Sequence, residues 1–202
     1  MSARTAPALR QYAAAVRTLV VLTVILGLAY PLGMTAIAQI TLRHNADGSL
    51  VSHGGRTVGS SLIGQSFTDH DGYFQSRPSA AGQDGYDALA SSASNLGPEN
   101  ADLVTAITQR RAAVAASDAV APRDVPPDAL LASGSGLDPH ISPAYARIQV
   151  ARVARERGLD VATVRRLVAQ HTQGRVIGFL GEPRVNVLEL NLALDRATDA
   201  AD

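Results

Sequence analysis

The chain has 202 residues, 46% of them hydrophobic and 4% aromatic, and its formal net charge is zero. It contains neither Cys nor Lys, and this excludes disulfides, thiolate chemistry and the Lys-dependent chemistries of P-loops, kinases and Schiff bases. From Arg43 onward the chain contains 15 of its 18 Arg and all 18 of its carboxylates, so this part has a small negative net charge. It lacks the positive charge that nucleic-acid binding requires, and no nucleic-acid partner is expected.

The first predicted element is a membrane-spanning helix over Thr18 to Leu42. These 25 residues carry no formal charge, and 12 of them are Leu, Ile or Val. A helix of that length spans roughly 37 Å, enough to cross a hydrocarbon core of about 30 Å. Pro31 lies within it and predicts a kink. Gly27 and Gly33 would allow another helix to approach closely, although a plain lipid-facing anchor is the simpler interpretation.

Basic residues flank the span unequally. Arg4, Arg10 and Arg17 precede it, whereas Arg43 and His44 follow it, which favours a cytoplasmic N-terminus. The sequence therefore predicts a cytoplasmic segment over residues 1–17, a transmembrane helix over 18–42 and an extracytoplasmic domain over 43–202. A cleaved signal peptide is the alternative, because residues 36–38 (AIA) fit a cleavage site, but the apolar stretch is longer than the usual 7–15 residues.

The remaining segments predict one compact α+β domain. Residues 47–85 are rich in Gly, Ser and Asp, and their apolar pairs Leu50-Val51 and Leu62-Ile63 indicate short strands between turns. A helix is expected over Pro98 to Ala116, and a short strand over Ala129 to Ala132 follows a Pro-rich loop.

Three helices are expected after that strand. Ser142 and Pro143 are a typical N-cap and first-turn pair for a helix that ends near Gly158, and another helix follows from about Asp160 to His171. The segment Val185 to Arg196 alternates like a strand, but Asn186 and Glu189 resemble a capping box and favour a helix.

Three groups of polar residues contain side chains that could carry chemistry. Ser133, Ser135, Asp138 and His140 contain the residue types of a hydrolase, but they lack the G-x-S-x-G spacing, and a Gly-rich turn explains them better. Asp69, His70 and Asp71 lack a known metal-binding spacing, so no metal site is predicted. The stretch 144–171 is helix, turn, helix and resembles a DNA-binding motif, but the net acidic domain and its expected place outside the cytoplasm argue against DNA as a partner. The Arg of this stretch that would suit phosphates are Arg152, Arg155, Arg157, Arg165 and Arg166.

Several blocks carry a more specific resemblance. They are residues 59–67 (GSSLIGQSF), 72–80 (GYFQSRPSA), 94–98 (SNLGP), 132–143 (ASGSGLDPHISP), Gln149 with 152–154 (RVA), 181–187 (GEPRVNV) and 190–195 (LNLALD). In this order, after one N-terminal membrane helix, they resemble the C subunit of the bacterial Kdp-type high-affinity potassium-transporting ATPase. The resemblance covers nearly the whole chain.

The resemblance implies a non-catalytic accessory subunit, needed for assembly and activity of the pump. Its partners would be a channel-like subunit that binds potassium and a P-type subunit that hydrolyses ATP through a phosphorylated Asp. Without Lys, this chain cannot contain the Asp-Lys-Thr-Gly motif of that reaction. The family's C subunit is described as a catalytic chaperone that raises the affinity of the pump for ATP.

Candidate site residues follow from the same resemblance. The family's nucleotide proposal makes Gln149 the candidate cofactor residue, with ATP reached through the complex. The expected topology places Gln149 on the opposite side of the membrane from ATP, and this favours a structural hydrogen-bonding role. Candidate partner-binding residues are Gly27, Pro31, Gly33, Tyr73, Arg77, Asn95, Asp138, Arg152, Arg184 and Asn186. The alternative is an anchored extracytoplasmic hydrolase that uses Ser135 and His140.

Overall fold

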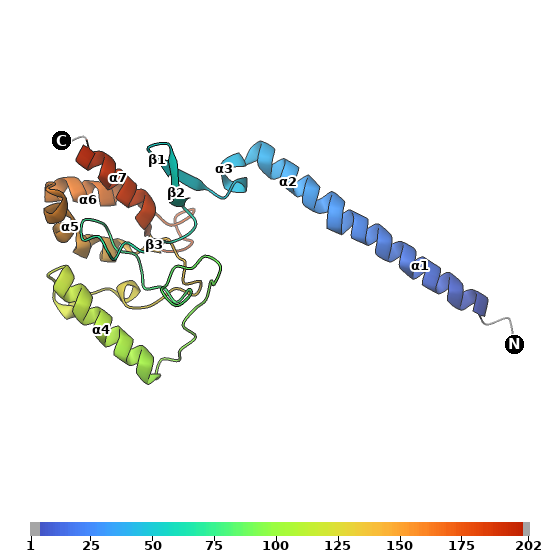
Figure 1. The fold of residues 1–202 in the computed structure, drawn as a ribbon, viewed down its shortest axis with the longest axis horizontal. Helices are drawn as coiled ribbons and strands as arrows, with labels where there is room; N and C mark the ends of the chain where they lie inside the picture. The colour runs from blue at the N-terminus through green and yellow to red at the C-terminus, as the bar shows by residue number, and fades with distance from the viewer. Residues whose placement is uncertain (1–4, 200–202) are drawn as a thin grey trace. The chain divides into compact units, whose positions relative to one another are not determined.

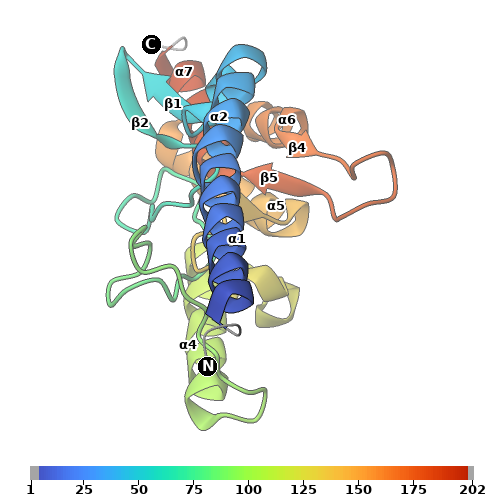
Figure 2. The same ribbon diagram turned by 90° about the vertical axis from the view of Figure 1, so that its right-hand side faces the viewer.

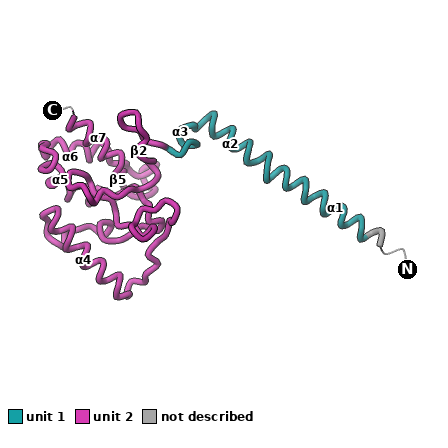
Figure 3. The backbone as a smooth tube through the Cα atoms, in the orientation of Figure 1, with its two compact units in different colours: residues 1–49 teal, residues 50–202 magenta. Residues whose placement is uncertain are grey.

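The computed structural model describes residues 5–199, which form two compact units, 1–49 and 50–202 (Figure 3). The first unit is a long helix in consecutive parts: α1 (Thr5–Val24), a π-helical turn η1 (Ile25–Ala29) and α2 (Tyr30–Thr41), followed by the short α3 (Arg43–Ala46). Within it, Ala8–Thr41 is one helix of 34 residues, long and apolar enough to cross a membrane. The predicted span is confirmed as a candidate membrane helix, and it begins earlier than the charge pattern indicated.

The π turn explains how the helix passes Pro31. Proline has no N–H to donate to the preceding turn, and such defects are commonly absorbed by a single wide turn. Here the N–H of Tyr30 donates to the carbonyl of Ile25, five residues back. The helix then continues into α2, where Thr35 Oγ1 donates to the Pro31 carbonyl at 2.8 Å. The helix therefore accommodates Pro31 through a π turn that lies just before the proline, while the predicted kink stays a prediction.

The second unit is a mixed α+β domain, as predicted (Figures 1 and 2). Its strands form two small antiparallel sheets, β1-β2 and β3-β5-β4. The elements are β1 (Leu50–His53), β2 (Arg56–Ser60), α4 (Ala101–Ser117), the 3₁₀ turns η2 (Pro122–Asp124) and η3 (Pro127–Ala129), β3 (His140–Ile141), α5 (Pro143–Arg157), α6 (Val161–Gln170), β4 (Thr172–Gln173), β5 (Arg184–Asn186) and α7 (Val187–Asp199).

Helix α5 lies at the centre of the core, and its ends follow from its sequence. Ser142 caps the N-terminus by accepting the N–H of Tyr145 at 3.0 Å, and Gly158 ends the helix in the left-handed conformation at φ 64°. Its inner face packs with residues from α6, α7 and the loops. The buried apolar residues of α5 are Tyr145, Ala146, Val150, Val153 and Ala154.

The other two late helices are also confirmed. Asp160 precedes α6, and α7 begins directly after β5, where Asn186 Oδ1 accepts the N–H of Glu189 at 3.1 Å. Half of the expected capping box is therefore present. The leucines of α7 are buried, which explains why the helical interpretation outweighs the alternating pattern.

Three local predictions are wrong. Leu50 and Val51 lie in β1, but Leu62 and Ile63 lie in a turn outside any strand. Residues 129–132 form no strand, because Pro126 and Pro127 direct the chain into the 3₁₀ turn η3. Helix α4 begins at Ala101 rather than Pro98, since Asn100 Oδ1 accepts the N–H groups of Asp102 and Leu103 and makes Asn100 the N-cap.

Candidate functional site

The candidate site is centred on an irregular segment, residues 71–75, that lies against α5 and α7. We call it the clamped segment. Two buried side-chain amides bind its main-chain groups, as a neighbouring strand would do in a sheet. Gln149 Oε1 accepts the N–H of Gln75 at 2.6 Å, and Gln149 Nε2 donates to the Gln75 carbonyl at 3.3 Å. Asn191 does the same for Phe74, at 2.8 Å and 3.0 Å.

Both amides are buried, and so is the residue between them. Gln149 and Phe74 are 0% exposed and Asn191 is 2% exposed. A buried amide without partners costs about 1–3 kcal/mol, whereas these two are bonded at both ends. The family resemblance makes Gln149 the nucleotide candidate; the structure places it inside the core, where it supports the backbone of the clamped segment.

Arg152 continues the same network from α5. Its Nε donates to Asp118 Oδ1 at 2.7 Å, and Nη2 donates to Gln149 Oε1 at 2.9 Å. Nη1 donates to the carbonyls of Asp71 and Tyr73, the latter at 3.0 Å. Burial raises the pKa of Asp118, while the hydrogen bond and charge of Arg152 act in the opposite direction. Arg152 therefore binds the clamped segment and a buried carboxylate.

Arg157, at the end of α5, holds the other end of the segment. Its Nε donates to the Gly72 carbonyl at 2.8 Å, and Nη2 donates to Asp195 Oδ1 at 2.8 Å. The guanidinium lies 4.2 Å from the centre of the Tyr73 ring, and the Tyr73 hydroxyl donates to Asp195 Oδ2 at 3.2 Å. Arg152 and Arg157 are thus engaged inside the domain, which contradicts the hypothesis that they face phosphates of DNA.

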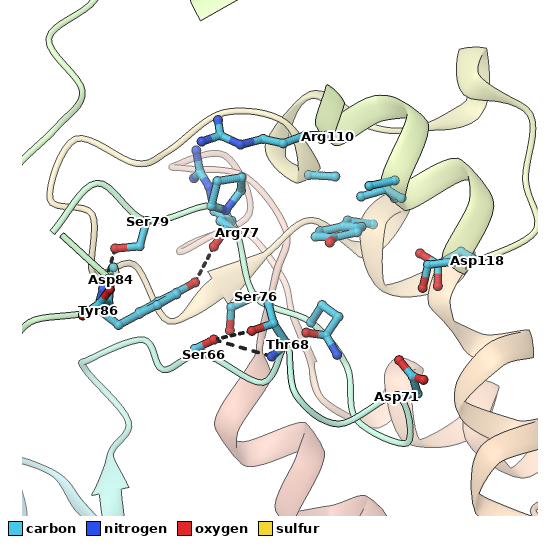
Figure 4. A pocket seen from close by; sticks show the side chains of 18 residues that line it. Ser66, Thr68, Asp71, Ser76, Arg77, Ser79, Asp84, Tyr86, Arg110 and Asp118 are labelled. Carbon is cyan, nitrogen blue, oxygen red and sulfur yellow. Dashed lines mark hydrogen bonds between the residues drawn. The ribbon is translucent and has the colours of Figure 1, made fainter. Parts of the chain in front are cut away.

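A pocket of about 420 Å³ lies beside the clamped segment, between the 66–86 loop and α4 (Figure 4). Asp71 and Asp118 lie at one side of it, and Ser79 and Tyr86 lie at the other. The Tyr86 hydroxyl donates to the Arg77 carbonyl, and burial raises the pKa of Tyr86. Burial likewise raises the pKa of Tyr145, which also lines the pocket. Both phenols stay protonated at neutral pH.

Two serines of this pocket, Ser76 and Ser79, donate to main-chain carbonyls. Ser76 Oγ donates to the Gln65 carbonyl at 2.7 Å, and Ser79 Oγ donates to the Gly136 carbonyl at 2.6 Å. A nucleophilic serine needs a base within hydrogen-bonding reach of its hydroxyl. These hydroxyls instead fix the loops that line the pocket.

A second cluster joins Arg77, Asp138 and His140. Asp138 Oδ2 accepts Arg77 Nη1 at 3.1 Å, and Asp138 Oδ1 lies 3.2 Å from His140 Nδ1 and accepts the His140 N–H at 3.0 Å. Burial raises the pKa of Asp138, but the two hydrogen bonds from His140 and the charge of Arg77 outweigh it, so the pKa lies below its ordinary value. The carboxylate stays ionised and fixes both partners.

The hydrolase alternative requires Ser135 to bond His140. Ser135 Oγ instead accepts the N–H of Leu137 at 3.1 Å and lies 3.3 Å from Ser133 Oγ. These contacts are those of a turn, as the Gly-rich sequence indicates. The structure therefore gives this alternative no support.

The other predicted residues lie outside the clamped segment, and two of them lie beside the second cluster. Asn186 pairs with His140 across β3 and β5, and Arg184 lines a pocket together with Arg77, Asp138 and His140. Asn186 is buried and donates to the Ser61 carbonyl at 2.8 Å. Asn95 is exposed in an irregular segment with φ 53°, and exposed Arg184 donates to Gln173 Oε1 at 3.1 Å. Gly27, Pro31 and Gly33 belong to the long helix of the first unit. Of the predicted set, only Tyr73, Gln149 and Arg152 meet at the clamped segment, while Arg77 and Asp138 pair with each other.

Sequence reasoning gave Asp118, Asn191 and Asp195 no role, and it considered Arg157 only as a contact for DNA phosphates. Asn191 gave a detectable signal, because it is a single amide within the buried leucine face of α7. The two aspartates gave none, because no nearby residue in the sequence indicates the Arg that each of them binds. Their roles depend on partners 34 and 38 residues away.

Comparison with known proteins identifies the family to which this chain belongs. One candidate membrane helix and an α+β domain with an internally bonded polar network are the features expected of a membrane-anchored accessory protein. Residues 12–196 match the model of the family described as KdpC: K+-transporting ATPase, c chain. The chain belongs to the KdpC family and is accordingly a subunit of a potassium-transporting ATPase, with an accessory role in potassium uptake.

Relatives support this assignment over most of their length. Proteins named "Potassium-transporting ATPase KdpC subunit" from Kineococcus radiotolerans and Sorangium cellulosum are 60% and 58% identical to this chain. The first alignment covers 94% of this chain and 95% of the relative, and the second covers 89% and 94%. A third such protein, from Koribacter versatilis, is 54% identical over 87% of this chain and 89% of its own. The resemblance inferred from the sequence blocks is confirmed.

Proposed function

We propose that this chain is a non-catalytic subunit whose folded domain acts outside the cytoplasm. The apolar helix Ala8–Thr41 supports an anchored chain. Arg10 and Arg17 near its start, against Arg43 directly after it, support a cytoplasmic N-terminus. Residues 1–17 would then be cytoplasmic, 18–42 would span the membrane, and 43–202 would form the extracytoplasmic accessory domain.

Catalysis is assigned to a partner. ATP hydrolysis would take place on a P-type subunit that forms a phosphorylated Asp, and potassium would bind a channel-like subunit. The absence of Lys from this chain supports that division, because the phosphorylation motif requires one. The small residues Gly27 and Gly33 and the π turn before Pro31 would let the membrane helix pack against the channel-like subunit.

The observation that carries the proposal is the complete internal pairing of Gln149 and Arg152. Both lie inside the domain, and each polar end is bonded to the clamped segment or to Asp118. Side chains that are bonded in this way make the clamped segment rigid. Their polar groups are not available to a nucleotide. Any effect on the ATP affinity of the pump would therefore pass through contacts between subunits, with the clamped segment fixing the surface that makes them.

The test is a truncation after residue 49, at the boundary between the two units. The anchor remains, and the domain is lost. We expect ATP-dependent potassium uptake to fall to the level of cells without the chain, and the ATPase to purify in lower yield. Full uptake by an assembled complex that contains only residues 1–49 would contradict the proposal.

A further inference from the structure

The connection between β4 and β5 carries an exposed apolar tip. All residues from 173 to 184 are exposed, and in Figure 2 this connection projects away from the sheet between the two labelled strands. We call residues 174–182 the projecting hairpin. Four of five successive side chains at its tip are large and apolar: Val176 is 57%, Ile177 74%, Phe179 71% and Leu180 51% exposed. A patch of this kind, on the order of 400 Å², marks an interaction site more often than a free surface.

The tip has a defined conformation. Val176 and Leu180 exchange two main-chain hydrogen bonds, at 2.9 Å and 3.0 Å, which closes a three-residue loop. In this loop Gly178 has φ 83°, a value that suits glycine, and Ile177 has φ 47°. A β-branched residue rarely adopts that conformation, and doing so costs free energy. The chain therefore keeps a large apolar side chain at a position where Gly or Asn would fold more easily.

Charge at the base of the hairpin helps to identify the occupant. Arg175 Nη2 pairs with Glu182 Oε2 at 2.8 Å, and Arg175 Nε donates to the Gly181 carbonyl at 3.1 Å. Segments that bind anionic lipid surfaces rely on free Lys or Arg. Here the nearest Arg, Arg175, is paired with an acid. The charge pattern favours an apolar protein pocket over an anionic lipid surface.

A second copy of this chain is also a poor occupant. A stable protein interface needs about 800 Å² from each partner, roughly twice what this tip exposes. A short, preorganised apolar protrusion is better suited to be the anchor within a wider contact, where one or two deeply inserted side chains supply most of the affinity.

We propose that the projecting hairpin docks into an apolar pocket on another subunit of the same ATPase, with Ile177 and Phe179 as its anchors. This inference rests on the proposed function, because it requires the folded domain to contact a partner subunit. The hairpin fixes the position of the domain on the complex, while the clamped segment shapes the domain itself.

The experiment exploits the absence of Cys from the chain. Val176→Cys places one thiol beside the two anchors with little change in size, and Leu89→Cys places a control thiol at a side chain that is 98% exposed outside the hairpin. Maleimide labelling of each variant is timed in three preparations. These are the full chain alone in detergent, the full chain alone in vesicles with anionic lipid, and the ATPase complex purified from cells through a tag on this chain.

We expect the thiol of the Val176→Cys variant to react at least tenfold more slowly in the complex than in the other two preparations, which corresponds to about 1.4 kcal/mol of protection. The thiol of the Leu89→Cys control should react at one rate throughout. Adding Phe179→Asp to the Val176→Cys variant should restore fast labelling in the complex. Adding Ile177→Gly should do the same without lowering the thermal midpoint, since glycine suits φ 47°.

Each other result overturns the inference. Protection in vesicles alone would identify lipid as the occupant, and protection in detergent alone would indicate a second copy of the chain or the chain itself. Fast labelling of the Val176→Cys variant in an intact complex would leave the proposed function standing and remove the docking role. A tagged chain that purifies without any other ATPase subunit would overturn both.

Discussion

Replacing Gln149 by Ala tests the clamped segment most sharply. The substitution removes the acceptor of the Gln75 N–H at 2.6 Å and of Arg152 Nη2 at 2.9 Å, and it leaves the Gln75 carbonyl without its donor at 3.3 Å. Two buried donors without acceptors, at about 1–3 kcal/mol each, predict a loss of about 4 kcal/mol. At about 2–4 °C per kcal/mol for a domain of this size, the thermal midpoint should fall by roughly 10 °C.

The assay is thermal unfolding of the full-length chain in detergent, monitored through the near-ultraviolet circular dichroism of its tyrosines. Hydrogen exchange at the amide of Gln75 gives a local readout, and about 3 kcal/mol of lost protection corresponds to roughly a hundredfold faster exchange. Gln170→Ala, at an exposed position on α6, is the matched control and should change the midpoint little.

The nucleotide role proposed for this residue in the family predicts a different outcome. If Gln149 contacts ATP, Gln149→Ala should weaken the response of the pump to ATP and leave the unfolding midpoint and the exchange of Gln75 unchanged. That combination would refute the structural reasoning. We expect the opposite order: stability is lost first, and pump activity falls only as far as the folded fraction does.

Three further substitutions probe the same domain. Arg152→Met should lower the free energy of unfolding by about 3–5 kcal/mol, because it leaves the buried carboxylate of Asp118 unpaired. In thermal unfolding, the double variant with Asp118→Leu should lose less than the sum of the two single variants, and strict additivity would argue against the ion pair. Gly136→Ala should lower the free energy of unfolding by about 2–4 kcal/mol, because φ is 69° and a Cβ would lie 2.5 Å from a main-chain oxygen. Gly134→Ala, where a Cβ meets open space, is the control and should be nearly neutral. Equal unfolding midpoints for the two variants would contradict this geometry. Asp138→Asn should destabilise the domain at neutral pH, because the lowered pKa of Asp138 means that its ionised carboxylate stabilises the fold above the ordinary pKa of about 3.9. This contribution disappears as the pH falls through the lower pKa of the folded state, so the difference in midpoint from the unmodified chain should shrink steadily as the pH falls below the ordinary pKa.

Helix ends were predictable where local side chains decide them. Ser142 and Gly158 set the two ends of α5 through a cap and a left-handed residue, and the capping role of Asn186 identified α7 despite its alternating leucines. The membrane helix followed from composition alone. For the helix ends the information lies within one turn of the chain, and for the membrane helix it lies within one continuous segment, so a single sequence can supply both.

The clamped segment could not be predicted in the same way. Its main-chain groups are satisfied by side chains 74 and 117 residues away, so nothing in the local pattern of residues 61–100 indicates where they bond. The sequence blocks did identify Gln149 and Arg152 as members of the site. Their orientation toward the core depends on bonds to the clamped segment and to Asp118, which no periodicity in α5 alone reveals.

The side of the membrane on which the domain lies is the central claim, because it separates this chain from cytoplasmic ATP. Leu89→Cys in the otherwise Cys-free chain gives a single exposed reporter for it. Intact spheroplasts that contain this variant are treated with a membrane-impermeant maleimide before and after lysis. We predict complete labelling before lysis; labelling that appears only after lysis would place the domain in the cytoplasm and contradict the account.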